Sequence, residues 1–258
     1  MKLSLSGRLV ESGGTTLVPL PEFLELAARC GYDAVDLRAT QLGPDAAAEE
    51  IEALRVGLAD NHLELFEGQH RDPVDEGTFS RLAEHVAGLG GRGIRVGGDL
   101  AEWRRAARLA APHGLKVHYQ MHTGGPFETV AAAAEAIREV GEPNFGVMPE
   151  PSNLLLAGES FTEDMFGPLA GRIVGVHVQT LEVRPDGASS LRVADGTEVR
   201  FARVPYEENR QIDFATFFAA LRRAGFDGAV NELEPCPGRE DLERTVAEAA
   251  RFLRPLLG

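Results

Sequence analysis

The sequence predicts an α/β fold, a (β/α)8 TIM barrel with a hairpin insertion after strand seven. A helix–Gly–strand junction recurs along the chain, and eight apolar runs have the length and spacing of parallel strands. The chain has 258 residues, and barrels of this kind typically have about 250. We therefore expect a single domain that covers residues 1–258.

The recurring junction is clearest at two places. Residues 28–37 read Ala-Arg-Cys-Gly-Tyr-Asp-Ala-Val-Asp-Leu, and residues 223–230 read Arg-Ala-Gly-Phe-Asp-Gly-Ala-Val. Gly31 and Gly225 suit the left-handed position that ends a helix, and the apolar run that follows becomes the next buried strand. Similar junctions, roughly 24 to 30 residues apart, fall near Asn61, Gly90, Gly114, Gly141 and Gly171.

The apolar runs define the predicted strands. They cover residues 2–5, 34–39, 63–67, 93–97, 116–121, 145–149, 173–179 and 228–233. Between them lie segments such as 23–28 and 214–221, whose apolar residues have helical spacing. No Gly-x-Gly-x-x-Gly turn follows the first strand, which argues against a dinucleotide-binding fold.

One interval, from Gly171 to Gly225, is about twice as long as the others. Its excess, residues 181–212, contains alternating residues around Asp195-Gly196, a strong hairpin signal. Because it follows strand seven, this hairpin is expected at the active-site mouth. It could act as a lid or be a surface hairpin without a role in the site.

Composition excludes several classes of partner. The formal net charge is −14 without a run of Lys or Arg, so nucleic acid is not an expected partner. No segment approaches the roughly 18 apolar residues of a membrane span, and the first residues do not resemble a signal peptide. Cys30 and Cys236 are predicted at opposite ends of the barrel. These features predict a cytoplasmic protein with reduced cysteines.

Polar residues end four of the predicted strands. The segments 117–122, 146–150, 174–177 and 229–232 end with polar or metal-binding residues. Strand C-termini converge on one mouth of a (β/α)8 barrel, where its chemistry takes place. The sequence thereby predicts an oxygen and imidazole site for a divalent cation.

These strand ends resemble motifs of the xylose-isomerase-like TIM barrels, a superfamily often labelled sugar phosphate isomerase/epimerase. The similar motifs are Gln-Met-His at 120–122, Glu-Pro-Ser-Asn at 150–153, His-Val-Gln-Thr at 177–180 and Glu-Leu-Glu at 232–234. The resemblance implies a divalent metal, Mn²⁺, Mg²⁺, Co²⁺ or Zn²⁺, held by Glu, Asp, His and Glu.

Carried over residue by residue, the resemblance assigns the metal to Glu150, His177, Glu232 and Gln120. His177 and Glu232 match the family ligand type, Glu150 is one methylene longer, and Gln120 has lost the charge of the family Glu. An amide coordinates weakly and cannot act as a carboxylate base. Gln120 is therefore a weak ligand or a substrate contact.

The remaining site residues follow from the same motifs. Glu232 and Glu150 are the expected catalytic acid/base residues, and Gln120, His122, Asn153 and Glu234 are expected to bind substrate. Because Gln120 cannot act as a base, the second proton carrier would have to be Glu150, His118, His122 or Glu234. Glu232 and Glu234 compete for one ligand position, because both lie on one side of a strand with period two.

A further pair lies outside these motifs. Asp36 and Arg38, at the end of the second strand, could contact a sugar or form an internal ion pair.

The function implied is a metal-dependent isomerase or epimerase acting on a sugar, keto-sugar or related polyol by proton transfer through an ene-diolate. A lyase or dehydratase on the same site, or a non-catalytic barrel that binds a sugar or a partner, are the alternatives. The superfamily also includes apurinic endonucleases, but the net charge of −14 weighs against that activity. The expected partner is a small carbohydrate, and assembly as a homo-oligomer is compatible with the sequence.

Overall fold

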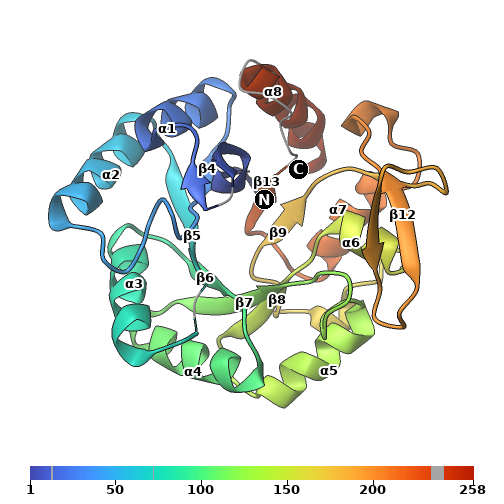
Figure 1. Cartoon of the computed structure of the whole chain (residues 1–258), viewed down its shortest axis with the longest axis horizontal. Helices are drawn as coiled ribbons and strands as arrows, with labels where there is room; N and C mark the ends of the chain where they lie inside the picture. Colours follow the sequence, from blue (N-terminus) through green and yellow to red (C-terminus); the bar gives the residue numbers. More distant parts are fainter. Residues whose placement is uncertain (13, 72, 234–240) are drawn as a thin grey trace.

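Within the part of the chain that the structure describes, eight parallel strands form a nearly closed barrel (Figure 1). The computed structural model describes residues 1–12, 14–71, 73–233 and 241–258. The sheet order is β8-β7-β6-β5-β4-β1-β13-β9. The strands are β1 (Lys2–Ser6), β4 (Ala34–Asp36), β5 (Glu64–His70), β6 (Gly93–Val96), β7 (Lys116–Gln120), β8 (Phe145–Met148), β9 (Val176–Val178) and β13 (Ala229–Glu232). The predicted TIM barrel is confirmed.

The edges of this sheet, β8 and β9, approach each other and close the barrel. Val147 forms a parallel bridge with Ile173, and the N–H of His177 donates to the carbonyl of Pro149 at 3.0 Å. Gly146 permits this approach, because a Cβ at that position would collide with the carbonyl oxygen of Arg172.

Helices cover the outside of the barrel (Figure 1). They are α1 (Leu20–Arg29), α2 (Ala48–Asp60), α3 (Glu76–Gly88), α4 (Leu100–Ala110), α5 (Val130–Val140), α6 (Pro151–Leu156), α7 (Phe214–Arg223) and α8 (Leu242–Leu253). Each longer helix packs through one apolar face. In α8, for example, Leu242, Val246, Ala249 and Leu253 are buried, with the spacing of one helical face.

The helix–Gly–strand junctions have the predicted backbone. Gly31 and Gly225 have φ angles of 80° and 79°, in the left-handed region. Near Asn61 the left-handed position belongs instead to His62, with φ of 55°.

Short elements join these units. They are the 3-10 helices η1 (Gly7–Val10), η2 (Ala111–His113), η3 (Gly167–Leu169), η4 (Tyr206–Glu208) and η6 (Arg254–Leu256), and the paired strands β2 (Glu11–Ser12) and β3 (Thr15–Thr16). The first of them, η1, begins directly after β1, and the Ser6 hydroxyl accepts a hydrogen bond from the N–H of Arg8. This turn places Arg8 at the C-terminal mouth of the barrel.

Apolar side chains fill the interior of the barrel at the N-terminal ends of its strands. Ala34, Phe66, Met148 and Ala229 form a separate buried cluster. Ala34 and Ala229 are the first residues of their strands. The N-terminal end of the barrel is therefore packed, and polar chemistry is left to the C-terminal end.

The segment 181–212 forms a small antiparallel sheet beside the mouth. Its strands are β10 (Glu182–Val183), β11 (Ser189–Arg192) and β12 (Glu198–Ala202), in the order β10-β12-β11. The turn between β11 and β12 contains Gly196, with φ of 90°. Leu181 and Phe201 pack on Leu156 of α6, which fixes this sheet against the barrel.

Two sequence expectations concern membranes and cysteines. Among the described residues, no helix combines the length and apolarity that crossing a membrane would require. Cys30 is a free, half-buried thiol. Cys236 lies outside the described residues, so its separation from Cys30 stays a prediction.

Candidate active site at the mouth of the barrel

Three buried side chains from neighbouring regions of the barrel form a cluster suited to a metal ion. They are Asp36 at the end of β4, Glu67 in β5 and His177 in β9, and one ligand atom of each lies within 4.8 Å of the others. Two carboxylates and an imidazole are donors that Mg²⁺, Mn²⁺ and Zn²⁺ accept in proteins.

A β-bulge brings Glu67 into this cluster. Val35 pairs with Leu65, but the next residue, Asp36, pairs with Glu67, so Phe66 is an additional residue in β5. In a regular strand Glu67 would lie on the same side as Leu65, away from Asp36. The extra residue turns Glu67 to the inside of the barrel, beside Asp36.

His118 in β7, two strands from Glu67 in the sheet order, borders the cluster. Its Nε2 lies 2.9 Å from Oε2 of Glu67, and both side chains are buried. Asp36 Oδ2 lies 3.5 Å from Nε2 of His177, and apart from these two contacts neither ring nitrogen of His118, nor Asp36 Oδ2 or Glu67 Oε2, has a hydrogen-bond partner among the described residues. Buried polar atoms normally have their hydrogen-bonding capacity filled, so these sparsely bonded atoms suit a bound cation.

The charges of the cluster also suit a cation. Burial and the nearby charge of Arg95 lower the pKa of His177 to about 3, so its imidazole is neutral. Burial alone would raise the pKa of Asp36, but the contact with His177 and the charge of Arg95 lower this pKa to about 2. A neutral imidazole and an ionised carboxylate are the forms that bind metal.

Arg95 in β6 connects this cluster to Gln120, which lines the mouth of the barrel. Its Nη1 lies 3.3 Å from Nε2 and 3.4 Å from Nδ1 of His177, and it donates to Oε1 of Gln120 at 3.2 Å. The guanidinium therefore lies between His177 and Gln120. Both of these residues are predicted from sequence to bind one metal, but the guanidinium lies between them.

The predicted residues Gln120, Glu150 and Asn153 do come together. Gln120 Nε2 donates to Glu150 Oε2 at 3.3 Å, Gln179 Nε2 donates to Glu150 Oε1 at 3.0 Å, and Asn153 Nδ2 also donates to this carboxylate. Glu150 is completely buried, and burial raises its pKa despite the hydrogen bond from Gln179. Three amides thus hold one carboxyl group whose proton affinity is increased.

Glu232 lies on the other side of its strand from the site. Asn231 is the residue that pairs in register with His177 and shares its side of the sheet, whereas Glu232 pairs with Val178. The Tyr32 hydroxyl lies 3.4 Å from the Glu232 carboxylate and 3.1 Å from the carbonyl of Val246 in α8, so it can donate its one proton to either. The structure therefore places Glu232 between the barrel and α8, apart from the Asp36–Glu67–His177 cluster. Glu234, the competing prediction, lies outside the described residues.

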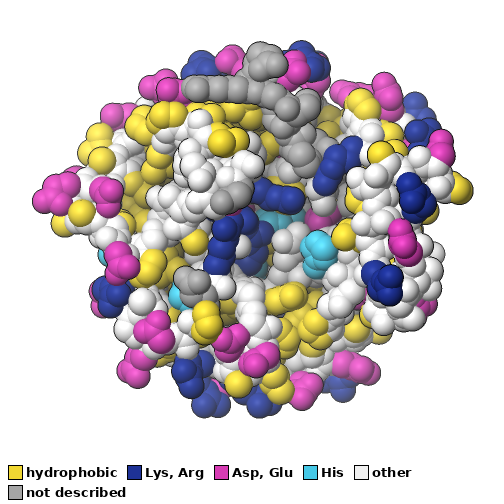
Figure 2. Space-filling view, in the orientation of Figure 1, with side chains coloured by type: hydrophobic (Ala, Val, Ile, Leu, Met, Phe, Trp, Pro, Cys, Tyr) yellow, Lys and Arg dark blue, Asp and Glu magenta, His cyan; other side chains and the backbone are white. Residues whose placement is uncertain are grey.

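A cavity of about 590 Å³ opens above these side chains. It is lined by Arg8, Arg38, Gln69, His70, Arg71, Arg95, Val96, Gly97, Tyr119, Gln120, His122, Glu150, Asn153, Leu156, Gln179, Leu181, Leu191, Phe201 and Arg203. Basic side chains and a histidine gather in the central hollow of this face (Figure 2). His122, a predicted substrate contact, is exposed on the wall of this cavity. The 181–212 segment contributes Leu191, Phe201 and Arg203 to the same wall.

A larger cavity, of about 970 Å³, lies on the outside of the barrel. It is bordered by α1, α2 and the loop of residues 39–46, and its lining lacks Arg95, Gln120 and Glu150, all of which line the cavity at the mouth. The cavity at the mouth is therefore the candidate active site.

Glu67 and Arg95 were not predicted from sequence as site residues, His118 was predicted only as one possible second proton carrier, and Asp36 was left as a sugar contact or an ion pair. A bulge has no reliable sequence signal, so the inward orientation of Glu67 could not be predicted. Arg95 and His118 lie within predicted strands, and their period-two alternation is the only signal that could have marked them as facing inward.

Known proteins share this fold. A family model described as "Xylose isomerase-like TIM barrel" matches residues 100–256. A crystal structure of D-psicose 3-epimerase in the presence of D-fructose is 18% identical, with a TM-score of 0.73 and 100% of both chains covered. No curated protein matched the chain.

Two other similar structures contain a metal. The IOLI protein with a bound zinc atom is 17% identical, with a TM-score of 0.70 and 100% and 98% of the two chains covered. A xylose isomerase-like TIM barrel protein from Mycobacterium smegmatis in complex with magnesium is 15% identical, with a TM-score of 0.73 and 99% and 96% covered. At these identities the likeness to solved structures concerns the fold.

Proposed function

The chain belongs to the family of xylose isomerase-like TIM barrels, and on this premise we propose that it is a metal-dependent isomerase or epimerase. The expected substrate is a sugar, keto-sugar or related polyol, in keeping with the D-psicose 3-epimerase among the similar structures. The observation that carries the proposal is the buried Asp36–Glu67–His177 cluster at the C-terminal end of the barrel, beneath a cavity that contains Glu150.

The proposed metal ligands are Asp36, Glu67 and His177, with His118 adjacent to them. This set replaces the one expected from sequence, because Gln120 and Glu150 are bonded to each other and Glu232 faces α8. A divalent cation held there would stabilise negative charge that develops on the substrate oxygens.

Glu150 is the proposed proton carrier. It is the one carboxylate among the described residues that line the cavity, and burial raises its pKa. A carboxyl group with a raised pKa both accepts and returns a proton more readily near neutral pH. Glu150 would move the proton on carbon next to the substrate carbonyl, giving an ene-diolate.

Two further residues on the wall have supporting roles in the proposal. The amide of Gln120 keeps the Glu150 carboxylate in place through the 3.3 Å hydrogen bond. Epimerisation through two faces of a planar intermediate needs a second proton carrier. The imidazole of His122, exposed on the cavity wall, is the candidate for that role.

Metal content tests the ligand assignment. We expect about one equivalent of metal in protein purified without chelator, measured by mass spectrometry, with a strong loss in Asp36→Asn and His177→Ala. Glu232→Gln is the matched control, because it also neutralises a buried carboxylate but leaves the cluster intact. Retention of metal in Asp36→Asn together with its loss in Glu232→Gln would reject this ligand set in favour of the one expected from sequence.

Turnover tests the chemistry separately. Incubation with a panel of ketoses in deuterated water should place deuterium on carbon next to the carbonyl of an accepted substrate. A panel without exchange or isomerisation, using metal-loaded protein, would contradict the proposed activity even if the metal is bound.

A further inference from the structure

The cavity at the mouth of the barrel has a strongly basic wall, although the protein as a whole carries a net charge of −14. Among its described lining residues are five arginines, Arg8, Arg38, Arg71, Arg95 and Arg203, and a single carboxylate, Glu150. Figure 2 shows dark blue side chains in the central hollow, with acidic side chains spread around the periphery. An isolated basic hollow on an acidic surface focuses the potential that attracts anions.

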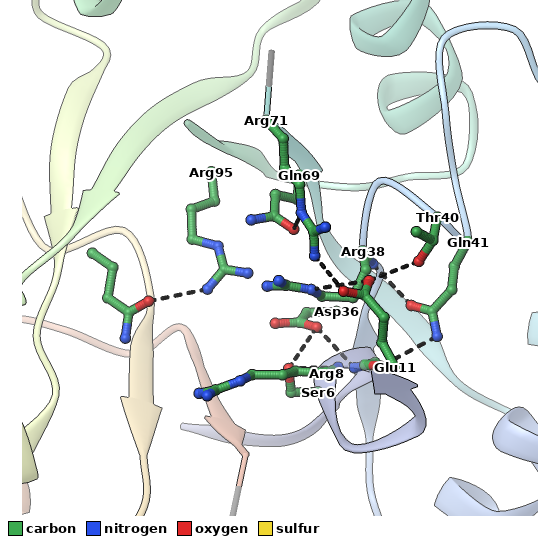
Figure 3. Close-up of polar contacts among 12 residues, drawn as sticks. Ser6, Arg8, Glu11, Asp36, Arg38, Thr40, Gln41, Gln69, Arg71 and Arg95 are labelled. Atoms are coloured by element: carbon green, nitrogen blue, oxygen red, sulfur yellow. Dashed lines mark hydrogen bonds and ion pairs between the residues drawn. The ribbon is translucent and has the colours of Figure 1, made fainter. Parts of the chain in front are cut away.

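These arginines come from separate elements and point toward a common space. Arg8 lies in η1, Arg38 follows β4, Arg71 follows β5, and Arg95 lies in β6. Figure 3 shows the side chains of Arg8, Arg38, Arg71 and Arg95 reaching toward one another from these elements. Arg203, which follows β12, completes the wall on the side of the small antiparallel sheet.

Two of the arginines are held by one acidic side chain. Arg38 Nε lies 3.5 Å from Oε2 of Glu11, and Arg71 bonds to Oε1 of the same carboxylate. The Glu11 side chain is only 6% exposed, and Thr40 donates to it at 2.7 Å. One carboxylate thus orders two guanidinium groups, which leaves a surplus positive charge at this wall (Figure 3).

Arg8 has no such partner. Within the described part of the chain its guanidinium forms no hydrogen bond or ion pair, and only its backbone N–H is bonded, to Ser6. Burial by the cavity wall and the charges of Arg203 and Arg95 lower the pKa of Arg8, against the opposing charges of Glu150 and Asp36. The Arg8 cation is therefore disfavoured where it lies, and an anion bound beside it would stabilise it.

The chemistry of guanidinium groups narrows the class of ligand. Their planar forks match the oxygen pairs of carboxylates and phosphoryl groups, whereas a neutral polyol offers no charge to balance them. Arg203 is fixed by donating to Gln179 Oε1 at 3.0 Å, and Gln179 in turn holds Glu150. The basic wall is thus connected to the proposed proton carrier.

We propose that the cavity binds the anionic group of its substrate, a carboxylate or a phosphoryl group, through Arg8 with Arg38, Arg71 and Arg203. This inference extends the proposed function, since it assigns to the substrate a charged group beside the carbon that exchanges its proton. It selects sugar acids or sugar phosphates over neutral sugars.

The test is equilibrium binding by calorimetry, with the full chain freed of metal by chelator and then dialysed. Inorganic phosphate is the first probe, followed by glucose 6-phosphate, gluconate and neutral glucose. We expect the phosphoryl or the carboxylate ligand to bind at least tenfold more tightly than glucose. Preference for glucose 6-phosphate would identify a phosphoryl group, and preference for gluconate would identify a carboxylate.

Two arginine variants test whether the anion binds at the basic wall. Arg8→Gln should weaken binding of the preferred anion about tenfold, while Arg138→Gln, on the exposed face of α5, should leave it unchanged. Equal binding of glucose and the anions, or an Arg8→Gln variant that binds as wild type does, would overturn the inference. Because the measurement is made without metal, its outcome is independent of whether the Asp36–Glu67–His177 cluster binds one.

Discussion

Nη1 of Arg95 lies 3.3 Å from Nε2 of His177, so a buried arginine cation contacts the imidazole of the candidate metal cluster. The same guanidinium donates to Gln120 and lines the cavity. Arg95 therefore borders both the cluster and the cavity, and a bound cation would have to share this environment with its positive charge.

Replacing Arg95 by Gln should strengthen metal binding. Two positive unit charges about 5 Å apart repel each other by on the order of 3 kcal/mol at an effective dielectric constant of about 20. Even with strong local relaxation, we expect Mn²⁺ to bind at least ~10-fold more tightly to Arg95→Gln. Titration with Mn²⁺ followed by electron paramagnetic resonance measures this, with Arg138→Gln as the control. An affinity equal to or below that of wild type would mean that Arg95 does not compete with the metal.

Replacing Glu150 by Gln should separate catalysis from metal binding. The amide keeps the size of the side chain but cannot carry the proton, so turnover of an identified substrate should fall by about 10²- to 10⁴-fold. Because Glu150 is bonded to Gln120, Asn153 and Gln179 and is absent from the cluster, metal content should stay at the wild-type level. A Glu150→Gln enzyme with undiminished turnover would remove Glu150 from the mechanism, and one that loses its metal would make it a ligand.

Replacing Glu11 by Gln should lower the stability of the protein, and added phosphate should restore part of it. Without this carboxylate the charges of Arg38 and Arg71 repel each other, and we expect about 1–2 kcal/mol less stability in urea. Phosphate should restore more stability to this variant than to wild type, compared with chloride at equal ionic strength. Glu52→Gln, which breaks an exposed pair with Arg55, should change stability by less than about 0.5 kcal/mol. An equal effect of phosphate on wild type and Glu11→Gln would argue against an anion at this wall.

Much of the barrel could be predicted because its signals are local. Apolar runs mark buried strands, and glycines such as Gly31 and Gly225 mark helix ends where the backbone is left-handed. The proximity of Gln120 and Glu150 also followed from sequence, since the C-terminal ends of parallel strands meet at one mouth.

The residues that escaped prediction depend on geometry that the sequence does not encode locally. A shift of one residue exchanges the two faces of a strand, which is why Asn231 rather than Glu232 shares the side of His177. The bulge at Phe66 makes the same exchange for Glu67. Arg8 and Arg203 meet at one cavity only because the barrel closes, so no spacing in the sequence could reveal the basic wall.

Closure of the barrel can itself be tested at Gly146. This residue lies in β8 where the strand approaches residues 172–174, and a Cβ there would collide with the carbonyl oxygen of Arg172 and crowd Val174. Backbone cannot give way as a flexible side chain can, so Gly146→Ala should lower the free energy of unfolding by about 2 kcal/mol or more, measured by urea denaturation. Gly88→Ala is the matched control, because Gly88 lies in α3 with open space around it. That substitution should raise stability by roughly 0.5–1 kcal/mol through the lower chain entropy of Ala in a helix. If both variants changed stability alike, the close approach of β8 and the 172–174 segment would not be what requires a glycine at position 146.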